Sequence, residues 1–458
     1  MQTRGRFLAS FTSLLMMSSA LGACSLVPTY ERPAIAVPSN FDRPQGQSGA
    51  IAVAADWWTS FNDLELQQLM GEALTNNLDI MAALARIVQA QGSLRATNSS
   101  LLPQVEASGG ASRSDGNSKG TVSKSASGSL SISYAVDLWG LYRAQSEASE
   151  ASLRASMFDH EATVLLIQSS VATTYFTVLN LEDRLNIANE SLVAARETLK
   201  LVEARYKYGA VSALDLAQQR AAVASIEAGI PSLEDQLNAN RHALAILLGR
   251  VPEGFNISTK TAAALTLPAI ATGQPSTLLE RRPDIRRAEA QLQAANADIG
   301  AARAAFFPSL SLSASKTVDW LAGVGTTNGS SIAASLLAPI FSGGQLEGNL
   351  QSTKAKKAEL AANYSKTVLT SFGEVEDALS SAEANSRREA SLAVAATESR
   401  KAYDLSLASY KAGASDFTSV LDAQRSWLSA RDAQAQARLA QYTAAVNLFI
   451  ALGGGWES

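Results

Sequence analysis

The side chains best suited to catalysis and metal binding are scarce in this chain of 458 residues. It contains two histidines, His160 and His242, far apart in the sequence, and a single cysteine, Cys24. A zinc site, a Cys/His nucleophile pair or a disulfide framework needs more of these residues than the chain has. The glycine run at 453–455 lacks the Lys-Ser pair and the helix that follow in a phosphate-binding loop. With no clustered acid, base and nucleophile, the sequence predicts a protein that is not an enzyme and that holds no cofactor.

The composition favours long helices over a compact enzyme core. Hydrophobic residues make up 47% of the chain but aromatic residues only 6%, because much of the hydrophobic fraction is alanine. Small side chains let helices approach each other closely. The 38 Lys and Arg residues and 42 Asp and Glu residues give a net charge of -4 with no strongly basic segment, which argues against a nucleic-acid partner. The length leaves room for two or three domains, or for one elongated fold.

Residues 1–23 have the features of a signal peptide. Two arginines precede an apolar run, Phe7–Leu21, of about 15 residues, which is shorter than the roughly 20 that a membrane-spanning helix needs. The run ends in Leu-Gly-Ala followed by Cys24, and this tetrapeptide resembles a bacterial lipobox. The resemblance implies that Cys24 is the acylated first residue of the mature protein and that Ser25 directs it to the outer membrane. An ordinary signal peptide with an incidental cysteine is the alternative.

Residues 24–60 are predicted to form a lipidated N-terminal tether. Prolines stand at positions 28, 33, 38 and 44, which is too frequent for a helix because proline lacks the backbone donor. We therefore expect this segment to be extended, to lie along the body of the protein and to connect it to the lipid anchor.

The rest of the chain contains a tandem duplication. Leu78-Asp79-Ile80 recurs as Pro283-Asp284-Ile285, and three further motifs recur at an offset of 204 or 205 residues. An offset held to one residue over this distance predicts two structural repeats, residues 61–260 and 261–458. Each repeat should contain a short helix, a strand pair, a long helix, a turn and a returning helix.

Heptad periodicity identifies the longest helix of the first repeat. Apolar residues fall seven apart along the series Met157, Val164, Val171, Val178, Leu185, Leu192, Leu199 and Tyr206. Sustained heptads predict left-handed coiled-coil packing. The 67 residues from Tyr142 to Tyr208 contain no proline and no glycine, so a helix there would be about 100 Å long at 1.5 Å per residue. Residues 345–412 should match it in the second repeat.

Glycines are predicted to end both long helices, and shorter helices return from them. Gly209 and Gly413 stand where C-terminal glycines commonly end a helix. Long helical pairs are therefore expected over about 142–248 and 345–452. Short helices at 77–101 and 283–306 account for the difference in length, so each chain should contribute four helical strands around a common axis.

Serine- and glycine-rich segments interrupt the helices at about 104–138 and 308–341. In the first segment the apolar residues Leu130, Ile132 and Tyr134 alternate with serines, which gives one apolar and one small polar face. Such strands, near ten residues long, are typical of a transmembrane barrel around a wet lumen, although the strands of a soluble sandwich alternate likewise. Their position after a lipoprotein-type signal favours the membrane.

Four strands per chain cannot close a membrane barrel, because at least eight are needed to leave no free edge. Two subunits would give eight strands filled by side chains, whereas three would give twelve strands and an open bore. A conducting barrel therefore predicts a homotrimer.

Five motifs carry a resemblance to a known family: Cys24–Pro33, Asp56–Trp58, Arg281–Ile285, Ala304–Pro308 and Leu421–Arg425. Over essentially the whole mature chain the sequence resembles the outer-membrane efflux proteins, in particular the lipoprotein branch of TolC-like channels of tripartite RND-type systems. The resemblance implies a mixed α/β membrane protein, a homotrimer whose twelve-stranded β-barrel continues as a twelve-helix α-barrel across the periplasm. It also implies a periplasmic adaptor protein and an inner-membrane transporter as partners, outer-membrane lipid around the barrel, and passive export of drugs or other small molecules.

Candidate functional residues gather at the predicted helix-turn-helix tips. By its place in Leu-Asp-Ala-Gln, Asp422 matches the family's acidic constriction, and Thr418 falls where the family often has a bulkier apolar plug. Three copies of Asp422 on a three-fold axis would favour cations in the pore and make closure sensitive to pH. Asp215, in the turn of the first repeat, is the second gate candidate.

Both aspartates also have a purely structural interpretation. Ser212 with Asp215, and Ser419 with Asp422, have the spacing of a capping box, in which the acid satisfies a helix N-terminus. The two turns are predicted to differ in length by one residue, so the aspartates would not be equivalent in the duplication. The sequence leaves gating and capping open for both.

Further candidates flank the same turns. Tyr206 and Tyr410 end the apolar stripes, where packing is one reading and, in the family, a closing network is the other. Arg205 and Lys411 are expected to pair with carboxylates, to dock the adaptor, or to be solvated cations favoured by the helix dipole. In the Arg-Arg-Pro-Asp-Ile motif, Arg282 is expected to cover the start of the helix that follows it.

A lipid-anchored coiled-coil envelope scaffold without a pore is the alternative function. It would keep the anchor and the helices but would form no barrel and conduct no ions. The sequence does not identify the exported substrate or the partner pump, because selection in such systems occurs in the transporter.

Overall fold

The computed structural model describes residues 25–42, 54–115, 122–258, 261, 265–268, 270 and 275–454. The predicted signal peptide and Cys24 lie outside the described residues. The chain divides into two compact units. The strand unit comprises the chain up to Ile35, Ala85–Phe158 and Arg286–Thr367, and the helical unit comprises Ala36–Leu84, Asp159–Ile285 and Val368–Ser458. Each unit draws segments from both predicted repeats.

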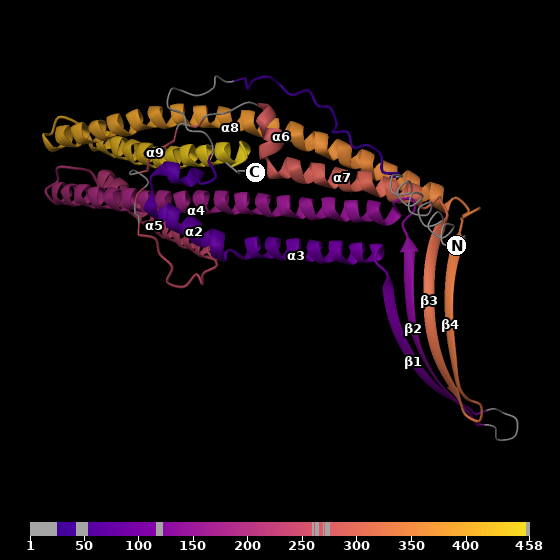
Figure 1. The fold of residues 1–458 in the computed structure, drawn as a ribbon. Coiled ribbons are helices and arrows are strands. Elements are labelled where there is room, and N and C mark those ends of the chain that lie inside the picture. The colour runs from indigo at the N-terminus through magenta and orange to yellow at the C-terminus, as the bar shows by residue number, and fades with distance from the viewer. Residues whose placement is uncertain are drawn as a thin grey trace. The chain divides into compact units, whose positions relative to one another are not determined.

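Two pairs of long and returning helices dominate the chain (Figure 1). Helices α4 (Leu141–Lys207) and α8 (Gln345–Lys411) have 67 residues each, and α5 (Ala213–Leu247) and α9 (Phe417–Ala451) have 35 each. All four helices begin and end within two residues of the predicted positions. Because each element recurs 204 residues later, the two turns have equal length, and the predicted one-residue difference is wrong.

Shorter helices accompany the long ones. They are α2 (Leu64–Asn76), α3 (Leu78–Asn98), α6 (Leu278–Arg281) and α7 (Pro283–Ala304), with 3-10 turns at Trp57–Phe61 (η2), Ser99–Leu101 and Pro275–Thr277. Asp63 caps α2 by accepting a hydrogen bond from the Leu66 amide at 2.9 Å, and Pro283 occupies the first position of α7, where its missing N–H costs nothing.

The two predicted hairpins form one antiparallel sheet in the strand unit. Strands β1 (Gln104–Asp115), β2 (Val122–Val136), β3 (Ser309–Leu321) and β4 (Gly325–Leu337) pair in that order. Ile132 on β2 lies opposite Ala314 on β3, which lies opposite Ile332 on β4, so the apolar face continues across strands. The other face carries paired serines, and the Oγ atoms of Ser315 and Ser331 are 2.9 Å apart. The strands run to 12–15 residues, longer than predicted.

Aromatic side chains fill the core of the helical unit. Trp57, from the Asp-Trp-Trp motif, is 2% exposed, stacks on Phe449 at 5.1 Å and donates to Gln168 Oε1. Burying each such ring contributes roughly 2–3 kcal/mol to folding. Since Trp57 belongs to the predicted tether of residues 24–60, the last residues of that segment are part of the core. Among the described helices, α4 contains a stretch long and apolar enough to cross a membrane, and 44% of that stretch is buried inside the chain.

Candidate functional site at the helix turns

Both turns of the helical unit use the same backbone device. Gly209 and Gly413 have φ angles of 70° and 76°, a left-handed conformation that glycine adopts without strain. In both turns the amide after the glycine donates to the carbonyl five residues earlier, at 2.9 Å. This pattern satisfies the last carbonyl groups of each long helix and reverses the chain.

The serine and the aspartate at the start of the returning helix occur in opposite order in the two turns. Ser212 caps α5, with its Oγ accepting from the Asp215 amide at 3.2 Å and Asp215 Oδ2 accepting from the Ser212 amide at 3.0 Å. The predicted capping box of Asp215 is therefore confirmed. In the second turn Asp416 is the cap, and its Oδ1 accepts from the amide and hydroxyl of Ser419 at 3.1 and 2.7 Å.

The predicted capping box of Ser419 with Asp422 is wrong. Since α9 begins at Phe417, Asp422 lies in the second helical turn, beyond the amides that need a cap. Hydrogen bonds from the Ser419 hydroxyl and amide lower the pKa of Asp416 below its ordinary value. The spacing of three residues after Gly413, matching Ser212 after Gly209, was the signal in the sequence for Asp416 as the cap.

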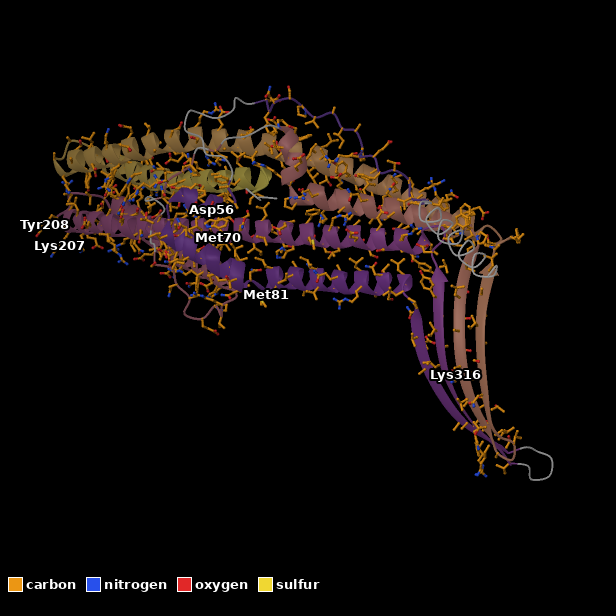
Figure 2. The ribbon with its side chains drawn as sticks, in the orientation of Figure 1. Asp56, Met70, Met81, Lys207, Tyr208 and Lys316 are labelled. Atoms are coloured by element: carbon orange, nitrogen blue, oxygen red, sulfur yellow. The ribbon has the colours of Figure 1, made fainter. Side chains whose placement is uncertain are left out.

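An apolar cluster at the turns, named here the tip cluster, packs the ends of the four helices. Its buried members are Val202, Leu216, Tyr403, Tyr410, Phe417, Val420, Leu421 and Trp427. Tyr410 is 3% exposed and its ring lies 5.6 Å from that of Phe417, whereas Tyr206, its equivalent on α4, is 45% exposed. Figure 2 shows the exposed Lys207 and Tyr208, the two residues that follow Tyr206 in the chain, at the end of α4. The two tyrosines that the sequence grouped together therefore have different surroundings.

Arg205 joins the end of α4 to the end of α8. Its Nη1 and Nη2 donate to the backbone carbonyls of Tyr410 and Lys411 at 3.0 and 2.9 Å, and its guanidinium lies 4.3 Å from the centre of the Tyr410 ring. The partners are carbonyl oxygens at the negative end of a helix dipole and not carboxylates, which were one of the three alternatives that the sequence left open. We call this contact the Arg205 clasp; the side chain of Lys411 is exposed.

The other two gate candidates lie on the exposed surface of α9. Thr418 and Asp422 are exposed, and within the described part of the chain the Asp422 carboxylate makes no hydrogen bond or ion pair. Asp215, in contrast, is half-buried and engaged in its cap. Asp422 is thus available for a role outside the folding of its own helix.

Several polar atoms near the turns are buried without a partner in the described chain. They include both amide atoms of Gln424, the Tyr410 hydroxyl and Ser415 Oγ. Gln219 on α5 donates to the Ala195 carbonyl at 2.7 Å, but its Oε1 is also buried without a partner in the described chain. Leaving a buried polar group unsatisfied costs about 1–3 kcal/mol, so these atoms reduce the stability of the tip. The Leu-Asp-Ala-Gln motif contains Gln424, but its burial depends on packing that the sequence does not show.

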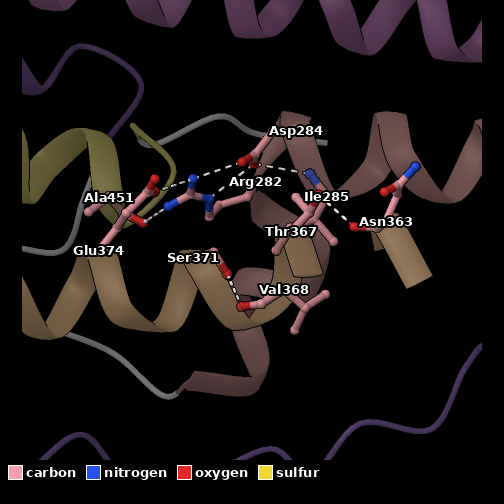
Figure 3. Close-up of polar contacts among 9 residues, drawn as sticks. All are labelled: Arg282, Asp284, Ile285, Asn363, Thr367, Val368, Ser371, Glu374 and Ala451. Carbon is pink, nitrogen blue, oxygen red and sulfur yellow. Dashed lines mark hydrogen bonds and ion pairs between the residues drawn. The ribbon is translucent and has the colours of Figure 1, made fainter. Parts of the chain in front are cut away.

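A second polar cluster fixes the start of α7 (Figure 3). Arg282 is buried and pairs with Asp284 at 2.8 Å and with Glu374 of α8 at 2.6 Å. Its Nη1 also donates to the Ala451 carbonyl at 3.1 Å, at the end of α9. Arg282 therefore does more than the predicted covering of one helix start, because it joins three helices of the helical unit. No group of acidic, histidine or cysteine side chains able to hold a metal ion occurs in the described ranges.

The helices, glycine turns and antiparallel sheet define the class of TolC-like outer-membrane channels. The chain superposes on the open state of the MtrE outer membrane channel of Neisseria gonorrhoeae with a TM-score of 0.84 and 30% sequence identity. The match covers 94% of this chain and 98% of that chain. The mixed helix and strand content expected from the sequence is therefore confirmed.

The chain belongs to the outer membrane efflux protein family, whose model matches residues 69–250 and 274–454. It is 38% identical over 460 residues to the pyoverdine export outer membrane protein OpmQ of Pseudomonas aeruginosa, with 97% of each chain covered. It is 33% identical over 462 residues to the cation efflux system protein CusC of Escherichia coli, with 96% of this chain and 97% of that protein covered. The chain is an efflux channel of the outer membrane, as the sequence predicted.

Proposed function

We propose that three copies of this chain form a passive conduit through the outer membrane. Each copy would contribute four strands to a twelve-stranded barrel and four helical strands to a tunnel in the periplasm. The proposal also includes the division into two repeats, residues 61–260 and 261–458, which the recurrence of 67- and 35-residue helices supports.

The observation that carries the proposal is the four-stranded sheet. Its outer strands, β1 and β4, each pair with one strand only in the described chain, so each leaves a row of backbone groups without a partner. In a bilayer such edges are prohibitive, because no water is present to satisfy them. Pairing β4 of one copy with β1 of the next satisfies both edges, and three copies give a bore that solutes can pass.

The cargo and the partners follow from the family. One relative is named for pyoverdine export and another for cation efflux, so chemically different small molecules leave through similar channels. We propose that this chain exports drugs or other small molecules with a periplasmic adaptor and an inner-membrane transporter. Acylated Cys24 would anchor each copy to outer-membrane lipid.

The gate would lie at the helix turns. Asp422 and Thr418 would form the constriction, since both side chains are exposed and Asp422 is unpaired within the described chain. The Arg205 clasp and Tyr410 would hold the two turns together in the closed state, and the exposed Tyr206 and Lys411 would meet the adaptor. Asp215 would contribute charge near the constriction in addition to its cap.

Planar-bilayer recording tests the conduit directly. The purified full chain should run as a trimer that dissociates only on heating, and it should give discrete ionic conductance steps in a planar bilayer. A lipid-anchored scaffold would bind to the bilayer but would give no steps. Monomeric protein, or trimers without conductance, would therefore overturn the proposal.

A further inference from the structure

We infer that α7 carries a dedicated binding site for the N-terminal segment Leu26–Arg32, and that this site fixes where the lipid anchor enters the membrane relative to the sheet. The inference rests on the proposed function, since it assumes that the chain is anchored at Cys24 and inserts its strands. All contacts that support it lie within the strand unit.

The segment and the helix face match in length. The contacts on α7 run from Glu289 to Arg303, which is about 21 Å at 1.5 Å per residue. Leu26 to Arg32 in extended conformation span about 20 Å at 3.3 Å per residue. The two run in opposite directions, with Arg32 at Glu289 and Leu26 at Arg303, so the segment is held in one register without slack.

A partly buried ion pair holds the C-terminal end of the segment. Arg32 donates to both carboxylate oxygens of Glu289, through Nε and Nη2, each at 2.8 Å. Tyr30 donates its hydroxyl to the same carboxylate at 3.3 Å. Glu289 is 9% exposed, and a bidentate pair on a shielded carboxylate is stronger and more selective in geometry than a surface pair. Burial, together with the Glu289 charge, raises the pKa of Tyr30, so the phenol stays a donor.

Side chains of α7 hold the backbone of the rest of the segment. Asn296, which is buried, donates from Nδ2 to the Pro28 carbonyl at 2.7 Å, and Arg303 donates from Nη1 to the Leu26 carbonyl at 3.2 Å. Lys357 of α8 donates to Asn296 Oδ1 at 2.8 Å, which orients the amide toward the segment. The side-chain amide of Asn296 thus donates to the segment and not to another residue of α7.

Gly300 provides the space into which the segment fits. A Cβ atom at this position would lie 2.8 Å from Val27 Cα and 2.9 Å from Val27 N, and in contact with its Cγ2. These atoms belong to backbone or lie next to it, so they cannot move away as the end of a flexible side chain would. In the same unit a Cβ at Gly348 of α8 would meet nothing within 4 Å. Gly300 is therefore a fit determinant, and Gly348 is a matched control.

The direction in which the segment runs along α7 determines where the lipid anchor lies relative to β3. Arg303 is the next-to-last residue of α7, and β3 begins at Ser309. Cys24 precedes Leu26 by two residues, a reach of at most about 7 Å. An acyl chain on Cys24 would therefore enter the bilayer next to the start of β3. Holding the anchor at this point raises the effective concentration of the strands at the membrane, as a short link between two binding modules does.

The first experiment measures release of the segment in the full chain. Chymotrypsin cleaves after Tyr30, and Gly300→Ala should raise the cleavage rate at this bond at least tenfold over wild type. Gly348→Ala should leave the rate unchanged, because its Cβ enters open space. Equal cleavage of wild type and Gly300→Ala would overturn the binding site.

The second experiment tests the role of the site by pulse-chase conversion to heat-stable outer-membrane trimers. Gly300→Ala should slow conversion as much as Cys24→Ser does, and the double variant should be no slower than either. A released segment with a wild-type rate, or additive defects in the double variant, would overturn the role in anchor placement. Trimers that do form should conduct as wild type, so failure of the conduit itself would appear separately, in the bilayer recording.

Discussion

At the scale of single residues, two aspartates near equivalent turns have different surroundings. Asp215 accepts the Ser212 amide in a capping box, whereas Asp422 is exposed and unpaired within the described chain. The sequence left capping and gating open for both aspartates, because each is the last residue of the same Ser-x-x-Asp pattern. Only the position at which α9 begins separates them, and this depends on Asp416.

Replacing each acid by its amide should separate the two roles. Asp215→Asn keeps an amide oxygen that can accept from the Ser212 amide, so it should lower the free energy of unfolding by only about 0.5 kcal/mol, and it should reduce cation selectivity less than Asp422→Asn does. Asp422→Asn should leave stability unchanged and should reduce cation over anion selectivity, since three carboxylates leave the constriction. Thermal unfolding and the reversal potential in a salt gradient measure the two effects.

Glu203→Gln, at an exposed acid on α4 that pairs with Arg220, is the control for charge alone. Unchanged selectivity in Asp422→Asn would remove it from the gate.

The cap at Asp416 predicts a pH dependence of stability. Hydrogen bonds from Ser419 lower the pKa of Asp416 in the folded state below its ordinary value of 3.8. A lowered folded-state pKa means that the stabilisation is fully present above pH 3.8 and is lost as the pH falls through the lower folded value. Asp416→Asn, which caps without titrating, should therefore unfold with a weaker pH dependence between pH 5 and pH 2.5. If the melting temperatures of wild type and Asp416→Asn fall equally as the pH is lowered over this range, the prediction is contradicted.

At the scale of the elements, local sequence signals predicted the helices. The same signals did not predict the tertiary contacts. Glycine, proline and the heptad series fix where α4 and α8 begin and end, because each acts on the backbone next to it. The order of strands in one sheet, the Arg205 clasp and the burial of Gln424 join residues far apart in the sequence. No pattern within one segment could contain that information, so the sequence predicted the elements of the candidate site but not its contacts.

The Arg205 clasp predicts how firmly the two turns are joined. Arg205→Lys keeps the charge but loses the fork that reaches two carbonyl groups at once. Losing one charge-assisted hydrogen bond costs about 1.5–3 kcal/mol, so if the clasp holds the closed state the open probability of single channels should rise roughly tenfold or more. Arg220→Lys, at an exposed ion pair that joins α5 to Glu203 of α4, should change the open probability little. An open probability that does not respond to Arg205→Lys would limit the clasp to a role in folding.

At the scale of the whole molecule, the sheet supports the proposal that several copies work together. Its apolar and serine faces are continuous over four strands, but its two outer strands pair on one side only in the described chain. These free edges support the proposed assembly, in which the outer strands of neighbouring copies pair with each other. A scaffold without a pore would need neither the alternating faces nor the matched register.

The two faces of β4 provide the sharpest test of membrane insertion. Ile332 is 92% exposed on the apolar face, and its neighbour Ser331 points to the serine face, opposite Ser315. A lysine on the lipid side near the middle of the bilayer costs about 2–4 kcal/mol, whereas a lysine in a wet lumen is tolerated. Ile332→Lys should therefore strongly reduce the yield of heat-stable trimers in the outer membrane, while Ser331→Lys should assemble normally and shift the channel toward anions. Trimer yield on gels and the reversal potential in bilayers measure the two outcomes. Equal tolerance of both lysines would show that water lies on both faces of the sheet, and the barrel would then be excluded.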